Sequence, residues 1–81
     1  MFKNNKFLFD DDQYLIENHQ AKYDTRADCI EQTIALRNQI DALNILLDHK
    51  SGQVEETGNL IFKFIFRSES DYQQVKCLLQ Q

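Results

Sequence analysis

Two histidines and two cysteines are the side chains in this sequence best suited to bind a metal or to act as nucleophile and base. They are His19, Cys29, His49 and Cys77. Structural zinc sites contain close ligand pairs such as Cys-x2-Cys or His-x3-His, and no two of these four residues lie that close together. Nucleophilic catalysis needs a thiol or hydroxyl beside a base that a third group orients, and the sequence shows no such arrangement. We therefore predict neither a metal site nor a catalytic site.

Glycine-rich phosphate loops are also excluded by the sequence. Such loops need several glycines close together, whereas Gly52 and Gly58 are the only two in the chain and each is isolated. A chain of 81 residues has little room for a substrate pocket. The sequence therefore predicts a non-enzymatic protein with no cofactor and no small-molecule substrate.

Three consecutive aspartates, Asp10 to Asp12, allow three interpretations. Carboxylates at the start of a helix cap its free amides and favour the positive end of its dipole, and we prefer this interpretation. The same cluster could block the edge of a sheet. A metal site would need further oxygen ligands and a turn glycine, which the neighbouring sequence lacks.

Length and composition indicate one small cytoplasmic domain, residues 1–81. A core of this size gains stability from a partner subunit. Nine basic and thirteen acidic residues give a net charge of −4, which provides no general attraction for nucleic acid or an anionic membrane. Two cysteines are too few for a disulfide framework, so we expect free, buried thiols in a reducing compartment. The N-terminal apolar run is too short for a signal peptide or a membrane span.

The N-terminal part of the chain predicts a strand followed by a helix. Phenylalanines alternate within Lys6 to Phe9, which is typical of a short strand. The following segment, from Asp12 to about Tyr23, carries an imperfect apolar stripe that predicts a first helix. The members of the stripe are Tyr14, Leu15, Ile16, His19 and Tyr23.

A long central helix is predicted from Thr25 to Lys50. Thr25 and Asp28 have the spacing of a capping box, in which each side chain accepts a hydrogen bond from the other residue's amide. Apolar residues then recur every three or four positions as far as Leu47, and Ser51-Gly52 supplies an exit from the helix.

The central helix carries two apolar rows. The first comprises Cys29, Thr33, Leu36, Ile40, Leu43 and Leu47, and the second comprises Ile30, Ile34 and Ile45. We predict that one row packs inside the protomer while the other meets a second copy, as a homodimer would require. The alternative is that both rows serve one small core. The candidate interface with a second copy or another protein comprises Ile30, Thr33, Leu36, Ile40, Leu43 and Leu47.

The C-terminal part of the chain predicts a hairpin and a closing helix. The segments Gln53 to Glu56 and Leu60 to Arg67 flank Thr57-Gly58-Asn59, a turn sequence. One face of the second segment is strongly apolar, and we expect the central helix to cover it; that face carries Leu60, Phe62, Phe64 and Phe66. Ser68 to Asp71 then caps a helix whose apolar positions are Tyr72, Val75, Leu78 and Leu79. The predicted fold is α+β, with the order β-α-α-β-β-α.

The N-terminal half resembles the ribbon-helix-helix family of bacterial, phage and plasmid repressors and antitoxins. The similar parts are the short strand from Lys6 to Phe9, a first helix, and the helix opening from Asp24 to Ile34. In that family two strands pair and enter the major groove, while the second helix contacts phosphate. The resemblance implies that Asn4 and Lys6 contact bases, and that Thr25 and Arg26 hold the DNA backbone.

Two functions follow from these patterns. The acidity, the surplus apolar helix surface and the Phe-rich strand favour a small regulatory protein that acts by protein binding, as an inhibitor, antirepressor or antitoxin does. The alternative is a ribbon-helix-helix DNA-binding regulator, which the resemblance implies and the net charge disfavours. We expect the first.

Overall fold

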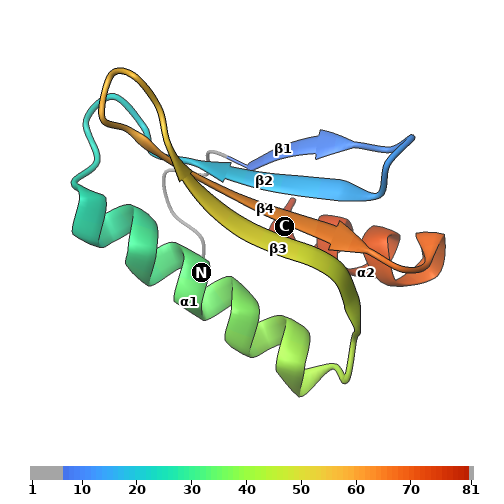
Figure 1. The fold of residues 1–81 in the computed structure, drawn as a ribbon. Helices are drawn as coiled ribbons and strands as arrows, with labels where there is room; N and C mark the ends of the chain where they lie inside the picture. Colours follow the sequence, from blue (N-terminus) through green and yellow to red (C-terminus); the bar gives the residue numbers. More distant parts are fainter. Residues whose placement is uncertain (1–6, 81) are drawn as a thin grey trace.

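The computed structural model describes residues 7–80 as a four-stranded antiparallel sheet with two helices on one face (Figure 1). The elements are β1 (Phe7–Asp10), β2 (Leu15–His19), α1 (Arg26–Ala42), β3 (Leu47–Val54), β4 (Leu60–Phe66) and α2 (Glu69–Leu79). The strand order is β1-β2-β4-β3, so β1 and β3 are the edges. The α+β class is confirmed. The predicted order with three helices is wrong, because these residues form two helices.

The segment predicted as a first helix, Asp12 to Tyr23, instead contains strand β2. This strand pairs with β1 on one side and β4 on the other. Ile16 faces the helices and is fully buried, while Leu15, on the opposite face, is almost as buried. Short apolar clusters suit a helix or a buried strand equally well, and here pairing in the middle of the sheet decides between them.

Asp10 ends β1, Asp11 and Asp12 lie in the turn that leads to β2, and none of the three caps a helix. One carboxylate oxygen of Asp10 accepts hydrogen bonds from the amides of Asp12 and Gln13, at 3.0 and 3.3 Å. Asp11 contacts α2: it accepts from the hydroxyl of Tyr72 at 2.5 Å and from the ammonium of Lys76 at 2.9 Å. The expected helix cap is therefore a turn that joins the β1–β2 hairpin to α2.

The central helix begins as predicted and ends earlier than predicted. Thr25 is its N-cap, and the capping box with Asp28 is present, which confirms that part of the prediction. The helix stops at Ala42 because Asn44 adopts a left-handed conformation, with φ of 56°. The amide of Asn44 then bonds to the carbonyl of Asp41, and the amide of Ile45 bonds to that of Ile40, a Schellman ending. The residues from Leu47 to Lys50 therefore belong to β3.

The C-terminal elements agree with the sequence. The hairpin of β3 and β4 turns at Glu55 to Asn59, where Gly58 has a φ of 89° that favours glycine. Its first strand begins at Leu47, six residues before the predicted start at Gln53. The hydroxyl of Ser68 accepts a hydrogen bond from the amide of Asp71 and so caps α2, as predicted.

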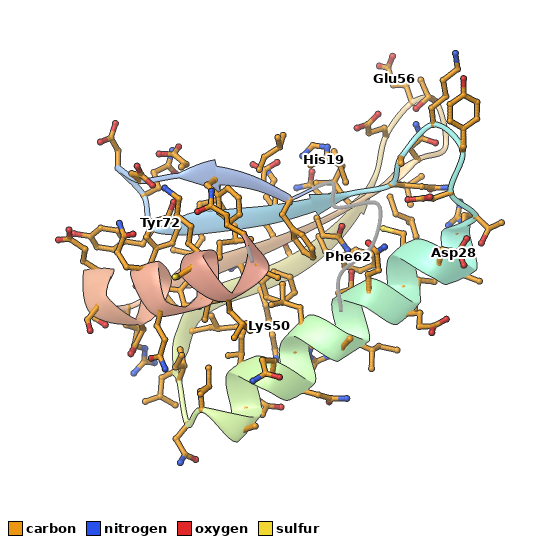
Figure 2. The ribbon with its side chains drawn as sticks, turned by 180° about the vertical axis from the view of Figure 1, so that it is seen from behind. His19, Asp28, Lys50, Glu56, Phe62 and Tyr72 are labelled. Carbon is orange, nitrogen blue, oxygen red and sulfur yellow. The ribbon has the colours of Figure 1, made fainter. Side chains whose placement is uncertain are left out.

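The core lies between the sheet and the two helices (Figures 1 and 2). It contains Phe7, Ile16, Leu36, Ile40, Ile45, Phe64, Phe66, Tyr72, Val75 and Leu79. The Phe-rich face of β4 is covered as expected, although α2 shares this task with α1. The outer face of the sheet is mixed in character: Lys63 and Glu17 are opposite each other there, beside partly buried Ile61 and Ile65.

Candidate functional site

A buried polar contact fixes the position of α1 against the sheet. The side-chain amide of Asn18, on β2, donates to the hydroxyl of Thr33 at 2.9 Å and to the carbonyl of Cys29 at 3.3 Å. Thr33 in turn donates to the same Cys29 carbonyl at 2.9 Å. At the start of α1, the guanidinium of Arg26 donates to the carbonyl of Gly58 in the β3–β4 turn at 3.1 Å. These bonds hold α1 to β2 and to the β3–β4 turn.

Strand β3 forms the longer edge of the sheet. It has eight residues, against four in β1, and all of them are exposed or only half-buried. The pairing with β4 is irregular between Leu47 and His49 and regular from Lys50 to Val54. Within residues 7–80 no strand pairs with its other side. An uncovered edge of this length is a template for another strand.

The hydrogen bonds show which peptide groups of β3 point outward. Leu60 bonds through its amide and carbonyl to Gln20, and the amide of Phe66 bonds to the carbonyl of Tyr14. The peptide groups of Leu60, Phe66 and the alternate residues between them therefore point toward β2. The peptide groups of the other residues of β4, Ile61, Lys63 and Ile65, therefore point toward β3. These residues are opposite Gln53, Ser51 and His49. It follows that Lys50, Gly52 and Val54 direct their amide and carbonyl groups away from the sheet.

One flank of α1 lies beside this edge. Arg37 lines a pocket together with residues 50–52 of β3, so the side of the helix that carries Arg37 faces β3. Ile34 and Ile30 precede Arg37 by three and seven positions, which places them on the same side of the helix. Ile30 is 41% exposed and Ile34 is 52% exposed. The β3 edge and these two isoleucines, which lie on the flank of α1 nearer to β3, are here together called the edge surface.

The residue at the centre of the edge surface, Gly52, is a glycine for a steric reason. A Cβ at this position would lie 2.9 Å from Cε1 and 3.2 Å from Cδ1 of Phe62, whose ring covers the glycine from the helix side. The ring thus occupies the space of a side chain at Gly52. This close packing explains why the regular part of β3 contains a glycine.

The structure places most of the predicted interface residues inside the protomer. Thr33, Leu36 and Ile40 are buried against the sheet, and Leu43 and Leu47 pack partly buried against the same core. Ile30 is exposed, as is Ile34 from the second apolar row. The first row is thus the protomer's own, and the exposed part of the second row contributes to the edge surface. Nothing in the sequence marked the β3 edge, because Leu47 to Lys50 appeared to continue a helix.

Of the four residues expected to contact DNA, Thr25 and Arg26 are in the described part of the chain, and both make contacts within the protomer. Asn4 and Lys6 lie outside the described residues. Thr25 is part of the capping box, where its hydroxyl accepts a hydrogen bond from the amide of Asp28 at 3.1 Å. Arg26 is bonded to the hairpin turn, as described above. In addition, the place of the family's first helix is taken here by β2.

The candidate catalytic and metal-binding residues are dispersed. Across residues 7–80 no group of three or more His, Cys, Asp or Glu side chains could hold a metal ion. Both cysteines are free; Cys29 is buried as expected, whereas Cys77 is exposed, contrary to the prediction. Burial raises the pKa of the Cys29 thiol, and the nearby charge of Asp24 raises it further, so this thiol is a poor nucleophile.

No family model matches the chain, and neither does any curated protein or solved structure. The resemblance to the ribbon-helix-helix family therefore remains a prediction. In the part of the chain that the structure describes, neither helix is both long and apolar enough to cross a membrane.

Proposed function

We propose that this chain is a non-enzymatic regulatory protein that acts by binding protein at the edge surface, and that its first partner is a second copy of itself. The observation that carries the proposal is the outward direction of the peptide groups of Lys50, Gly52 and Val54 beside exposed Ile30 and Ile34. Unpaired strand edges bind strands, and exposed apolar residues next to them add area to bury.

A second copy fits this surface by symmetry. Two antiparallel β3 strands are self-complementary, as the interface of a two-fold dimer must be. Their pairing would join two four-stranded sheets into one of eight strands. The α1 helices lie on the same face of each sheet and would meet through the flanks that carry Ile30 and Ile34. This arrangement supplies the added burial that a small core lacks.

The same surface can bind a strand of another protein. An extended segment added to β3 would gain main-chain hydrogen bonds and contact the two isoleucines. A regulator of the inhibitor, antirepressor or antitoxin type would act by exchanging its own second copy for such a target. The proposal therefore predicts competition between self-association and partner binding.

Sedimentation velocity over a range of protein concentrations tests the proposal. Wild-type protein is expected to reach twice the chain mass at high concentration. Val54→Pro removes an outward N–H that no residue of the described protomer uses, and it should shift the protein to monomer. Ile30→Gln with Ile34→Gln should weaken association about a thousandfold, because a two-fold dimer loses four half-exposed isoleucines and burying each contributes about 1 kcal/mol.

Leu8→Gln is the matched control for these changes. Leu8 is 57% exposed on β1, at the opposite edge of the sheet, and its replacement should leave the mass unchanged. Circular dichroism must show that each variant is folded. A wild-type protein that stays monomeric at millimolar concentration would contradict self-association, and so would variants that associate like the wild type.

A further inference from the structure

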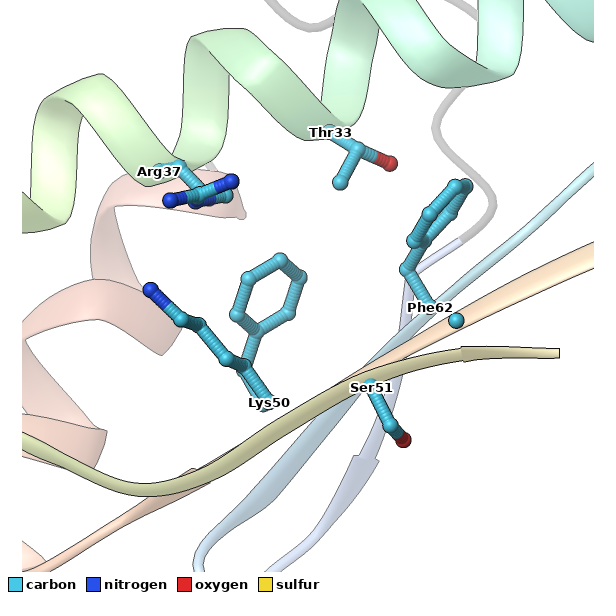
Figure 3. Close-up of a pocket in the computed structure, with 7 residues that line it drawn as sticks. Thr33, Arg37, Lys50, Ser51 and Phe62 are labelled. Atoms are coloured by element: carbon cyan, nitrogen blue, oxygen red, sulfur yellow. The ribbon is translucent and has the colours of Figure 1, made fainter.

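A pocket of about 230 Å³ lies between α1 and the β3–β4 hairpin (Figure 3). Thr33 and Arg37 line it from α1, and Phe62 and Phe64 line it from β4. The remaining lining residues are Lys50, Ser51 and Gly52 of β3. An apolar cavity of about 150 Å³ is enough to hold benzene, so this pocket has room for one aromatic ring with a small substituent.

Two cations converge on the mouth of this pocket, and neither forms an ion pair among the described residues. Arg37 and Lys50 come from different elements, and Figure 3 shows both side chains directed over the same space. Among residues 7–80 neither has a carboxylate within 4.0 Å, although the chain carries thirteen acidic residues. Two like charges facing one space repel each other. An anion placed between them attracts both, so the repulsion is replaced by a favourable interaction.

The other polar groups of the pocket are already used or point elsewhere. The hydroxyl of Thr33 donates to Cys29 and accepts from Asn18. Ser51 is opposite Lys63 in the sheet, and its hydroxyl is directed to the other face (Figure 3). What remains for a ligand is a pair of cations above two aromatic rings. Ligand pockets commonly have this composition, with a mostly apolar lining and a few polar groups that fix orientation.

We infer that this pocket binds a small aromatic carboxylate. The carboxylate lies between Arg37 and Lys50, where the planar guanidinium of Arg37 can donate two parallel hydrogen bonds. The aromatic ring lies against Phe62 and Phe64. All four residues belong to one protomer, so the pocket is complete without the proposed second copy. The sequence analysis predicted no small-molecule substrate and did not foresee this pocket.

Titration of the full chain with benzoate, followed by amide chemical shifts, tests the inference. Saturable shifts are expected at Arg37, Ser51 and Gly52, with a dissociation constant on the order of millimolar for so small a ligand. Benzyl alcohol has the ring without the charge, and acetate has the charge without the ring. Both should bind at least about tenfold more weakly than benzoate. Phenyl phosphate carries the other common anionic head group, and its affinity relative to benzoate tests the carboxylate assignment.

Charge-removing variants complete the test. Arg37→Gln and Lys50→Gln should each weaken benzoate binding about tenfold, because each removes a charged hydrogen-bond donor. Lys22→Gln is the matched control, since Lys22 is an exposed cation outside the pocket. Absence of shifts at the pocket, equal binding of benzyl alcohol, or wild-type affinity in both pocket variants would overturn the inference. Tighter binding of phenyl phosphate would overturn the carboxylate assignment.

Sedimentation of the same samples separates this result from the proposed function. Benzoate binding by a purely monomeric protein would support the pocket and contradict self-association. Self-association without benzoate binding would do the reverse.

Discussion

The buried contact between Asn18 and Thr33 gives a quantitative prediction about how α1 is held. Asn18 is fully buried, and its amide nitrogen donates to Thr33 and, at a longer distance, to Cys29. Its carbonyl oxygen is buried and has no hydrogen-bond partner. Thr33→Val removes the 2.9 Å acceptor and leaves the Asn18 amide with the 3.3 Å contact alone. A buried polar group left short of partners costs about 1–3 kcal/mol, so we expect a loss of about 2 kcal/mol.

The same substitution should cost almost nothing once Asn18 is apolar. Asn18→Leu keeps the branched shape of the side chain and removes both the amide and the unpartnered oxygen. The carbonyl of Cys29 then keeps its bond within helix α1. In this background Thr33→Val should change the free energy of unfolding by less than about 0.5 kcal/mol, which gives a coupling energy of about 1.5 kcal/mol.

Urea denaturation of the four proteins, followed by circular dichroism, measures this coupling. The free energy of unfolding is extrapolated linearly for the wild type, the two single variants and the double variant. Equal costs of Thr33→Val in the two backgrounds would refute the argument that Asn18 and Thr33 satisfy each other. The position of α1 would then depend on apolar packing and on the Arg26 bond to Gly58.

Two further predictions concern the hairpin and the β1–β2 turn. Gly52→Ala should lower the free energy of unfolding by about 1 kcal/mol, because its Cβ would meet the Phe62 ring at 2.9 Å. In a Phe62→Ala background the same substitution should cost nothing, and urea denaturation measures both effects. Hydrogen bonds from Tyr72, and to a smaller extent from Lys76, lower the pKa of Asp11 below its ordinary value of 3.8. The ionised Asp11 therefore stabilises the fold above pH 3.8, and this stabilisation is lost as the pH falls through the lowered pKa. The melting temperature of the wild type should therefore fall more steeply between about pH 5 and pH 2 than that of Asp11→Asn, and parallel curves would contradict this role of Asp11.

The parts of the fold predicted correctly are those with local signals. The capping box at Thr25, the cap at Ser68 and the turn glycine Gly58 each act within a few residues, so they are visible in the sequence. The apolar alternation of β4 is also local. These signals located the start of α1, the hairpin and α2.

The errors have a common physical cause, which is that strand pairing is not local. Leu15 and Ile16 of β2 pair with residues of β1 and β4, and β4 lies more than forty positions further along the chain. A helical stripe and a buried strand cannot be distinguished there by spacing. The end of α1 had one local signal, Asn44, which tolerates the left-handed conformation more readily than most residues do. The apolar residues that continue to Leu47 concealed it.

The candidate site was the least predictable part of the molecule. The edge surface and the pocket between α1 and the β3–β4 hairpin both depend on β3 lying beside α1, and β3 was predicted as helix along half its length. Arg37 and Lys50 are thirteen positions apart in the sequence and meet only because the chain reverses at Asn44. Such pairs become visible only once the topology is known.

Residue-resolved amide hydrogen exchange tests the central claim most directly. His49, Ser51 and Gln53 donate toward β4 within the protomer, whereas Lys50, Gly52 and Val54 donate outward. If two copies pair through β3, all six amides should be protected at high protein concentration, and the outward three should lose protection on dilution. Rapid exchange of Lys50, Gly52 and Val54 at every concentration, with the other three protected, would contradict pairing through this edge.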